Sequence, residues 1–325
     1  MASILFESTD TDAPQLSDAP GSLLDVLRAC LVDGYGSKAS LGWETVFYDA
    51  ATYKWVFRQK ESKANRPYIR LVDDNGYSSY KYSNHVYIYD FMYDIDRGVN
   101  RQPISTDSNY ASVFRKVDTT GNKPWKVIGD DFGFWFLVKH WDGDATYGDL
   151  WCPYYMGDFI SWSLEYKYPF VWLPASYYGS FDFLGNGYSS GYLLRNLNNS
   201  VLSNNKYVYS AGVGGGQSPG NTGYPDYSAN GIPYFGGADS YHPIILTTYN
   251  IWNPKYFIGR LPALALLKRA DAPSYVINSF DPYVEVVDTN TKIMTFHCRS
   301  TNNNPLTGTS SRLSIVIGEG FRNVF

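Results

Sequence analysis

Only one stretch of this sequence, GSLLDVLRACLVDGYGSKASLGW at residues 21–43, has the apolar spacing of an amphipathic helix. The apolar residues recur every three or four positions and form a single stripe along a helix: Leu23, Leu24, Leu27, Cys30 and Leu31. Ser22 is a favourable N-cap, and Asp25 three residues later completes a capping box. Gly34 stands where a left-handed C-cap is needed. We predict one short helix whose stripe packs on the protein's own sheet.

The rest of the chain alternates short β-branched and aromatic segments with turn formers, which is the pattern of β-strands. Its 30 Tyr, 18 Phe and 9 Trp suit the pleated surface of a sheet. We predict a mainly β, antiparallel, sandwich-like body with strands at residues 43–47, 53–58, 68–73, 86–94, 125–129, 132–138, 148–163, 168–174, 244–251, 256–267, 283–287, 292–298 and 313–317. Asp130-Asp131 and residues 288–291 are predicted hairpin turns. Residues 263–268 also fit a short helix.

Three regions are predicted along the chain. Residues 1–20 are polar and contain two prolines, so we expect an extended arm that buries no core of its own. Residues 21–165 are expected to form a helix plus β domain. Residues 166–325 are expected to form a loop-rich β domain, because Gly, Ser, Asn and Tyr dominate residues 175–241. The two larger regions are equally consistent with one continuous body.

Composition argues against several classes of function. The net charge of −4 and scattered Lys and Arg argue against a nucleic-acid partner. Three cysteines without CxxC spacing, Cys30, Cys152 and Cys298, indicate free thiols in a reducing compartment. The opening residues lack the pattern of a signal peptide, and no apolar run reaches transmembrane length. We expect synthesis in a cytoplasm and no membrane insertion.

Residue patterns for catalysis, cofactors or metals are weak. The four histidines lie far apart, and none belongs to an HxH motif, an HExxH motif or a Cys/His cluster; His85 and His297 fit ordinary sheet positions. The glycines at residues 212–216 lack the Lys-Ser/Thr of a phosphate-binding loop. Carboxylate pairs occur at Asp73-Asp74, Asp130-Asp131 and Asp142/Asp144, and we interpret each as a turn whose Asp bonds the local backbone. We predict no catalytic, cofactor or metal site.

The opening stretch resembles the N-terminal signature of a group of tailed-bacteriophage virion proteins. That signature has a Gly-Ser-Leu start, a leucine helix ending in Ala-Cys-Leu-Val, a Gly-aromatic-Gly turn, a Lys and Gly-Trp. The matching residues here are Gly21, Ser22, Leu23, Leu27, Ala29, Cys30, Leu31, Val32, Gly34, Gly36, Lys38, Gly42 and Trp43. Weaker similarity continues through residues 70–74, 89–96, the Trp125 strand at 124–130, 134–136, Gly157-Asp158, Arg260–Pro262 and 313–321. Ala263 replaces the usual Gly.

This resemblance implies a structural component of a phage tail or neck, collar- or sheath-like, that assembles as a symmetric homo-oligomer with other tail or neck proteins. It implies no enzymatic activity and no cofactor, and a location in the virion. Candidate interface residues are two in the arm, Asp10 and Pro14, and four in the loops, Tyr188, Tyr224, Tyr227 and Tyr234. The alternative is a host-surface-binding tail fibre or adhesin whose loops at 175–241 contact a glycan. A hydrolase of surface polysaccharide is a third hypothesis.

Overall fold

The computed structural model describes residues 2–60, 66–74, 83–102, 113–116, 121–139, 151–162, 167–173, 191–193, 207–211, 239–250, 253–268, 282–298, 311–319 and 321–322. These residues form a mainly β molecule with antiparallel sheets and one short α-helix, which confirms the predicted fold class. Most of residues 175–241, including Tyr188, Tyr224, Tyr227 and Tyr234, lie outside the described residues.

The N-terminal half supplies a helix and a small sheet. Helix α1 covers Ser22–Arg28 and continues as a π-helical turn, Ala29–Asp33. The small sheet has the order β2-β3-β4-β5-β8, with β2 Trp43–Asp49, β3 Lys54–Gln59, β4 Tyr68–Val72, β5 Ser83–Tyr89 and β8 Val113–Arg115. A separate hairpin follows β5 and consists of β6 Phe91–Met92 and β7 Gly98–Val99.

The large sheet contains thirteen strands. Along its path they are β1 Ile4–Glu7, β9 Trp125–Asp130, β10 Gly133–Lys139, β11 Trp151–Asp158, β13 Phe170–Leu173, β14 Gly191–Leu193, β15 Tyr207–Ala211, β16 Asp239–Asn250, β17 Asn253–Lys268, β20 Ser311–Gly318, β19 Thr291–Cys298 and β18 Tyr283–Val286, with β12 Ile160–Ser161 paired to β17. The predicted hairpins β9–β10 and β18–β19 are confirmed. Residues 263–268 belong to strand β17, so the alternative of a short helix there is wrong.

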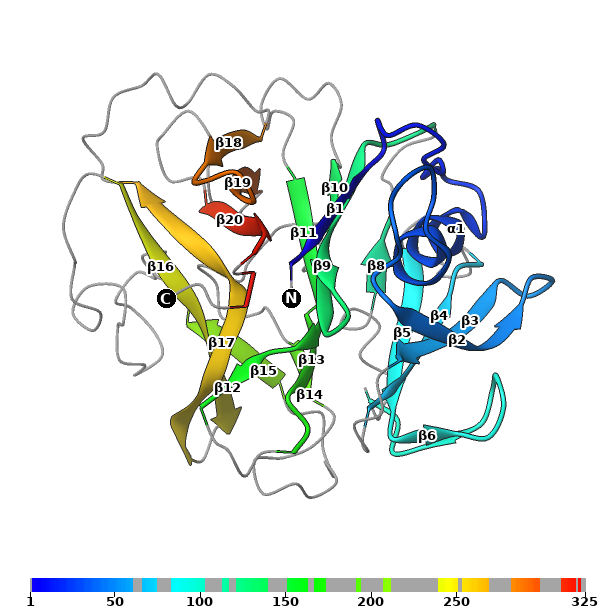
Figure 1. Cartoon of the computed structure of the whole chain (residues 1–325). Coiled ribbons are helices and arrows are strands. Elements are labelled where there is room, and N and C mark those ends of the chain that lie inside the picture. Colours follow the sequence, from blue (N-terminus) through cyan, green and yellow to red (C-terminus); the bar gives the residue numbers. More distant parts are fainter. Residues whose placement is uncertain are drawn as a thin grey trace.

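The described elements are arranged in three layers, and apolar side chains are buried between them. Figure 1 shows α1 and the small sheet on one side, strands β9–β11 and β13 in the middle, and β16–β20 on the other side. One face of the middle layer packs with α1 and the small sheet in a first core. The opposite face packs with β17, β19 and β20 in a second core. The middle layer is therefore covered on both faces.

Strand β10, GFWFLVK, shows why the sequence encodes such a layer. Phe134 and Phe136 enter the first core, whereas Trp135 and Leu137 enter the second. Successive side chains of a strand point to opposite faces, so a strand covered on both faces reads as an unbroken apolar run. The run 134–138 has this form, unlike the alternating pattern of a sheet with one solvated face.

The prediction that residues 1–20 form an extended arm without a core of its own to bury does not hold, because this segment is part of the large sheet and of the first core. Strand β1 pairs with β9 from Ile4 opposite Gly129 to Glu7 opposite Lys126. Phe6 and Leu16 are fully buried in the first core. Because a preformed sheet edge supplies the backbone partners, a segment with few apolar residues can still be ordered within its own chain.

The large sheet also runs through the predicted boundary at residues 165/166. Strand β11 pairs with β13 from Tyr155 opposite Leu173 to Asp158 opposite Phe170. Strand β12 pairs with β17 through Ile160 opposite Arg260. Backbone hydrogen bonds therefore connect the segments on the two sides of that boundary. No helix among the described residues is long and apolar enough to cross a membrane.

Candidate functional site

Helix α1 is capped by a side chain from the small sheet. Asp73, directly after β4, accepts hydrogen bonds at Oδ2 from the backbone N–H groups of Leu23 (2.8 Å) and Leu24 (3.4 Å). Its own carbonyl accepts from the N–H of Gly21 at 2.9 Å. A carboxylate at this position satisfies orphan donors and complements the helix dipole. The cap fixes the start of α1 against β4.

The predicted capping box of Ser22 and Asp25 was therefore wrong. Gly21, with φ of +84°, is the N-cap, and α1 has no cap from its own side chains. The Ser22 hydroxyl instead donates to the carbonyl of Ser17 at 2.7 Å. The interpretation of Asp73 as a residue that bonds its local turn was also wrong, because a partner about fifty residues away in sequence binds its carboxylate.

Asp73 forms a fully buried ion pair with Lys116, which follows β8. The Nζ atom of Lys116 lies 2.6 Å from Asp73 Oδ1 and donates a second bond, also 2.6 Å, to the carbonyl of Ala19. Burial raises the pKa of Asp73 to about 6, against the opposing effect of Lys116. Burial likewise lowers the pKa of Lys116. The pair joins β4, β8 and the segment before α1, at the cost of desolvating two charges.

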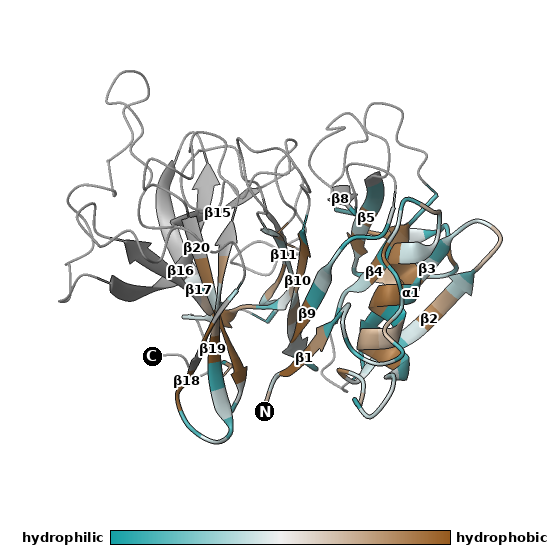
Figure 2. Cartoon of the chain, turned by 90° about the horizontal axis from the view of Figure 1, so that it is seen from above, coloured by the Kyte–Doolittle hydropathy of each residue, from teal (hydrophilic) through white to brown (hydrophobic). Residues whose placement is uncertain are grey.

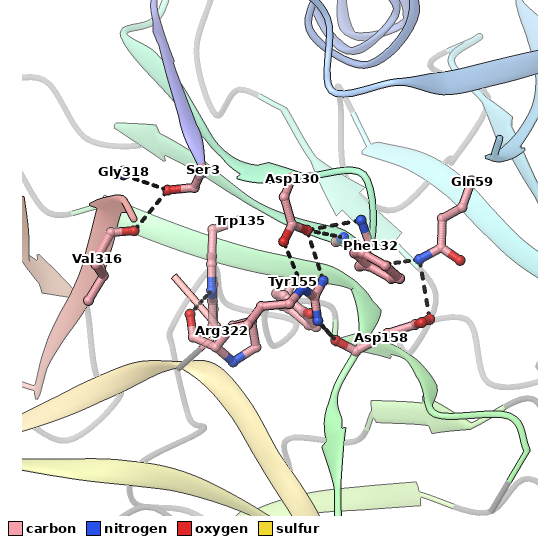
Figure 3. Close-up of polar contacts among 12 residues, drawn as sticks. Ser3, Gln59, Asp130, Phe132, Trp135, Tyr155, Asp158, Val316, Gly318 and Arg322 are labelled. Atoms are coloured by element: carbon pink, nitrogen blue, oxygen red, sulfur yellow. Dashed lines mark hydrogen bonds and ion pairs between the residues drawn. The ribbon is translucent and has the colours of Figure 1, made fainter. Parts of the chain in front are cut away.

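A second polar cluster lies at the β9–β10 turn. Asp130 Oδ1 accepts from the N–H groups of Phe132 (2.9 Å) and Gly133 (3.0 Å), which confirms its predicted turn role. Arg322 also binds this carboxylate through two nitrogens, at 2.7 and 2.9 Å, and donates to the carbonyl of Asp158 at 3.0 Å (Figure 3). Bidentate pairing of this kind orients both side chains. It ties the C-terminal segment to the middle layer.

Phe132 brings the small sheet into the same cluster. The guanidinium groups of Arg66 and Arg322 lie 5.0 and 4.8 Å from the centre of its ring. Gln59, the last residue of β3, donates to the carbonyl of Phe132 and to Asp158 Oδ1 (Figure 3). Cation–π contacts gain strength where the cation is desolvated, and Arg66 is 9% exposed. The small sheet, the middle layer and the C-terminus therefore meet here.

Both clusters hold separate segments of the chain together, and we call the pairs Asp73–Lys116 and Asp130–Arg322 joints. The carboxylates of Asp73 and Asp130 are each bound by a cation, the buried Lys116 and the partly buried Arg322, and by backbone donors. Across the described ranges, His, Cys, Asp and Glu side chains nowhere gather in a group of three that could hold a metal ion. His85 lies in β5, as predicted, and its burial lowers its pKa, which favours the neutral ring.

Most signature residues lie in or beside the first core. Leu27, Cys30, Trp43 and Trp125 are buried there. The indole N–H of Trp125 donates to the carbonyl of Pro14 at 3.0 Å, and that of Trp43 points to the carbonyl of Asp130. Burial raises the pKa of the Cys30 thiol well above its usual range, so this cysteine is held unreactive.

Two glycines of the signature stand where the backbone has a positive φ. Gly34 has φ of +76° at the end of the π-helical turn, and a Cβ there would lie 2.7 Å from the carbonyl oxygen of Lys38. Its ψ of 167° is extended, not the left-handed helical value that the sequence predicted. Gly36 also has a positive φ, +56°. Both positions favour glycine for steric reasons.

Asp10 and Pro14, predicted as interface residues, make contacts inside the chain. Asp10 Oδ2 accepts from the hydroxyl of Tyr35 at 2.8 Å and from Nζ of Lys38 at 2.5 Å. Both partners lie in the Gly-Tyr-Gly-Ser-Lys turn of the signature. Asp10 therefore helps to fix the N-terminal segment on the turn that follows α1.

Among the described residues, exposed apolar side chains occur on the β6–β7 and β18–β19 hairpins, besides Tyr48, Tyr53 and Trp162. We call Phe91, Tyr93 and Val99 of the β6–β7 hairpin the aromatic patch; these residues are 44%, 64% and 37% exposed. We call Val284, Val286 and Val287 of the β18–β19 hairpin the valine edge; these residues are 42%, 64% and 54% exposed. Neither was predicted, because a strand pattern in sequence does not show which face other elements cover.

No known protein-family model matches the chain, and no curated protein matches it either. The resemblance to phage virion proteins therefore depends on the residues quoted above.

The two joints were also difficult to predict from the sequence. Asp73 and Lys116 are 43 positions apart, and Asp130 and Arg322 are 192 apart. The one available signal was a charged residue directly after a strongly apolar strand, as at Asp73 and Asp130.

Proposed function

We propose that this chain is a structural protein of a tailed-bacteriophage particle, located in the tail or neck, where copies assemble as a symmetric oligomer with each other and with neighbouring tail proteins. The proposed role needs no catalytic step and no cofactor. Its two joints support a well-ordered building block, because one holds α1 on the small sheet and the other holds the C-terminal segment on the middle layer.

The observation that carries this proposal is the pair of exposed apolar patches. Exposed apolar residues that cluster on a folded chain mark surfaces where other macromolecules bind. Val284 and Val286 of the valine edge belong to β18, the last strand on the path of the large sheet among the described strands. Exposed apolar edge strands promote association unless a partner covers them. An assembly protein would cover them with neighbouring subunits.

The test is the protein content of the particle. Gradient-purified phage particles from the source that encodes this chain are analysed by quantitative mass spectrometry, with the major capsid protein as the reference. We expect the chain at a fixed copy number that survives repeated purification. Its loss from intact particles during purification, while it stays abundant in the lysate, would disprove the structural role.

A host-binding fibre or adhesin is the second candidate. The exposed ring of Tyr93 favours it, because exposed aromatic rings stack on sugar faces. A glycan array probed with the purified chain separates the two roles. Specific binding that is lost in Tyr93→Ala supports the adhesin, whereas no binding leaves the structural role as the better proposal.

A further inference from the structure

We propose that the side chains of Asp73 and Lys116 join in an amide bond, so that the ion pair between the ends of β4 and β8 becomes a covalent cross-link. The newly folded chain holds the ion pair, and the amide forms from it with time. This inference concerns the chemistry of the chain itself and does not depend on the proposed function.

The two atoms that would react lie close together. Nζ of Lys116 is 2.6 Å from Oδ1 of Asp73. Because a C–O bond of this kind is about 1.2 Å long, Nζ lies no more than about 3.8 Å from Cγ, the carbon that it attacks. Reacting atoms in a near-attack geometry are roughly 3–3.5 Å apart, so a small shift of either side chain is enough.

The surroundings of the pair favour the neutral amide over the two charges. Both side chains are fully buried. Apolar residues of α1 and β4 are buried together in the first core, and Figure 2 shows the hydrophobic residues of these two elements beside each other. Two charges are costly in such surroundings, whereas an amide and a released water molecule carry none. Burial therefore shifts the equilibrium from the ion pair toward the amide.

Burial also favours the neutral reactants. Transfer of a proton from Lys116 to Asp73 across their hydrogen bond gives an amine and a carboxylic acid, which are the forms that react. Burial raises the pKa of Asp73 to about 6 and lowers the pKa of Lys116, so both shifts favour this transfer. The carboxylates of Asp73, Asp18 and Asp74 oppose the shift at Lys116, but burial is the larger effect.

Backbone groups stand where charge develops during the attack. Oδ2 of Asp73 accepts hydrogen bonds from the N–H groups of Leu23 at 2.8 Å and Leu24 at 3.4 Å. Negative charge builds on this oxygen when Nζ adds to Cγ, and two donors aimed at it act as an oxyanion hole. The carbonyl of Ala19, 2.6 Å from Nζ, accepts from the attacking nitrogen and holds it in place.

The reaction balances without an oxidant, a reductant or any further reactant. The lone pair of the neutral Nζ forms the new C–N bond at Cγ, and the electrons of the C–O double bond move to Oδ2. The double bond to Oδ2 then re-forms as the Cγ–Oδ1 bond breaks. Oδ1 carries the proton of the first transfer, takes a second from Nζ and leaves as water, so one hydrogen stays on the amide nitrogen.

The amide keeps the contacts of the joint and adds a covalent constraint. Oδ2 remains as the amide oxygen, which still accepts from Leu23 and so retains the cap of α1. The new bond closes a loop between positions 43 apart. A cross-link of this kind restricts the unfolded chain as a disulfide does, so the cross-linked form is expected to unfold at a higher denaturant concentration.

The test is the mass of the folded full chain. High-resolution mass spectrometry follows the purified protein over several days at neutral pH, and peptide mapping locates any cross-link. The pair of Asp10 and Lys38 is a control within the same chain, because its N–O distance is 2.5 Å but its side chains are 18% and 30% exposed. Chain kept in denaturant is a second control.

The variant Lys116→Arg is a third control. It keeps a cation beside Asp73, but a guanidinium group stays protonated and does not attack the carboxyl group. Circular dichroism shows whether this variant folds. The peptide map of the unsubstituted chain decides the question even if it does not fold.

We expect the folded chain to lose the mass of one water molecule and to yield a branched peptide that joins Asp73 to Lys116. Lys116→Arg and chain kept in denaturant are expected to keep their full mass, and no peptide is expected to join Asp10 to Lys38. Unfolding measurements on the ion pair then use newly refolded chain whose mass is still complete.

Two outcomes would overturn the proposal. One is a folded chain that keeps its full mass throughout the incubation. The other is a loss of water without the branched peptide, or one that persists in Lys116→Arg, because either assigns the loss to cyclisation of an aspartate elsewhere.

Discussion

At the scale of single residues, the buried pair of Asp73 and Lys116 is the strongest determinant of how the N-terminal segment is held. Asp73 caps α1 while Lys116 binds the carbonyl of Ala19, so both ends of one ion pair hold the chain on either side of Gly21. Truncating one partner leaves the other charge buried without compensation.

Lys116→Met is therefore expected to lower the free energy of unfolding by about 3–5 kcal/mol. The double variant Asp73→Asn/Lys116→Met is expected to recover most of that loss, because no buried charge remains and the amide oxygen of Asn can still accept from Leu23. Urea unfolding measures both. A single variant within about 0.5 kcal/mol of the unmodified chain would show that the pair is not desolvated.

The raised pKa of Asp73 gives a pH dependence of defined sign. Its pKa rises from 3.8 to about 6 on folding, so the folded chain takes up a proton that the unfolded chain releases. The stabilising contribution is complete below pH 3.8 and is lost as the pH rises through 6.

The unfolding free energy of the unmodified chain minus that of Asp73→Asn should thus be about 2 kcal/mol more favourable at pH 4.5 than at pH 7.5. Chemical unfolding of both proteins at the two pH values measures this difference, in which other titrating groups largely cancel. A difference that is constant, or that grows toward pH 7.5, contradicts the pKa shift.

At the scale of elements, the β10–β11 pair depends on a glycine contact. Gly133 lies directly opposite Gly157, which has φ of +142°. A Cβ on Gly157 would overlap the Cα of Gly133 and lie 2.5 Å from the carbonyl oxygen of Phe132. The Gly-Asp step noted in the sequence therefore lets two strands approach closely, next to the joint at Asp130.

Gly157→Ala is expected to destabilise the chain by about 2 kcal/mol more than Gly121→Ala. Gly121 also has a positive φ, +103°, but a Cβ there would meet nothing within 4 Å, so this control carries only the backbone strain. Thermal unfolding of the two variants provides the comparison. Equal losses would mean that the strands can separate to admit a methyl group.

Strand β1 is expected to contribute to folding rather than to assembly alone. Phe6→Ala removes a fully buried ring from the first core and should cost about 3–5 kcal/mol. Leu5→Ala, on the opposite face and only partly buried, should cost less than half as much. Denaturant unfolding of the two variants measures the loss of unfolding free energy in each. A negligible loss for Phe6→Ala would restore the prediction of a loosely held arm.

The elements that the sequence predicted well are those whose signal is local. The hairpins β9–β10 and β18–β19 each combine two apolar runs with a short polar turn, and both form as predicted. The helical stripe from Leu23 to Leu31 is buried, also as predicted. In these segments the period of the apolar residues and the turn residues predict the element from local sequence alone.

The elements that the sequence predicted poorly depend on partners that are distant along the chain. Strand β1 has only four residues, and it is ordered because β9 offers an edge. The cap of α1 comes from Asp73, not from Ser22, because β4 brings a carboxylate to the helix start. Propensity rules recognise Ser22 as a cap but contain no information about a residue that the fold delivers from elsewhere.

At the scale of the whole molecule, strands β9–β11 and β13 of the large sheet form a middle layer that is apolar on both faces. The joint at Asp73–Lys116 holds α1 on the small sheet, and the joint at Asp130–Arg322 holds the C-terminal segment on the middle strands.

The account is tested most directly by a cryo-EM map of the gradient-purified phage particle at a resolution that traces this chain. It predicts adjacent copies of this chain around the tail or neck axis. A map in which the tail and neck density is fully assigned to other proteins would contradict it.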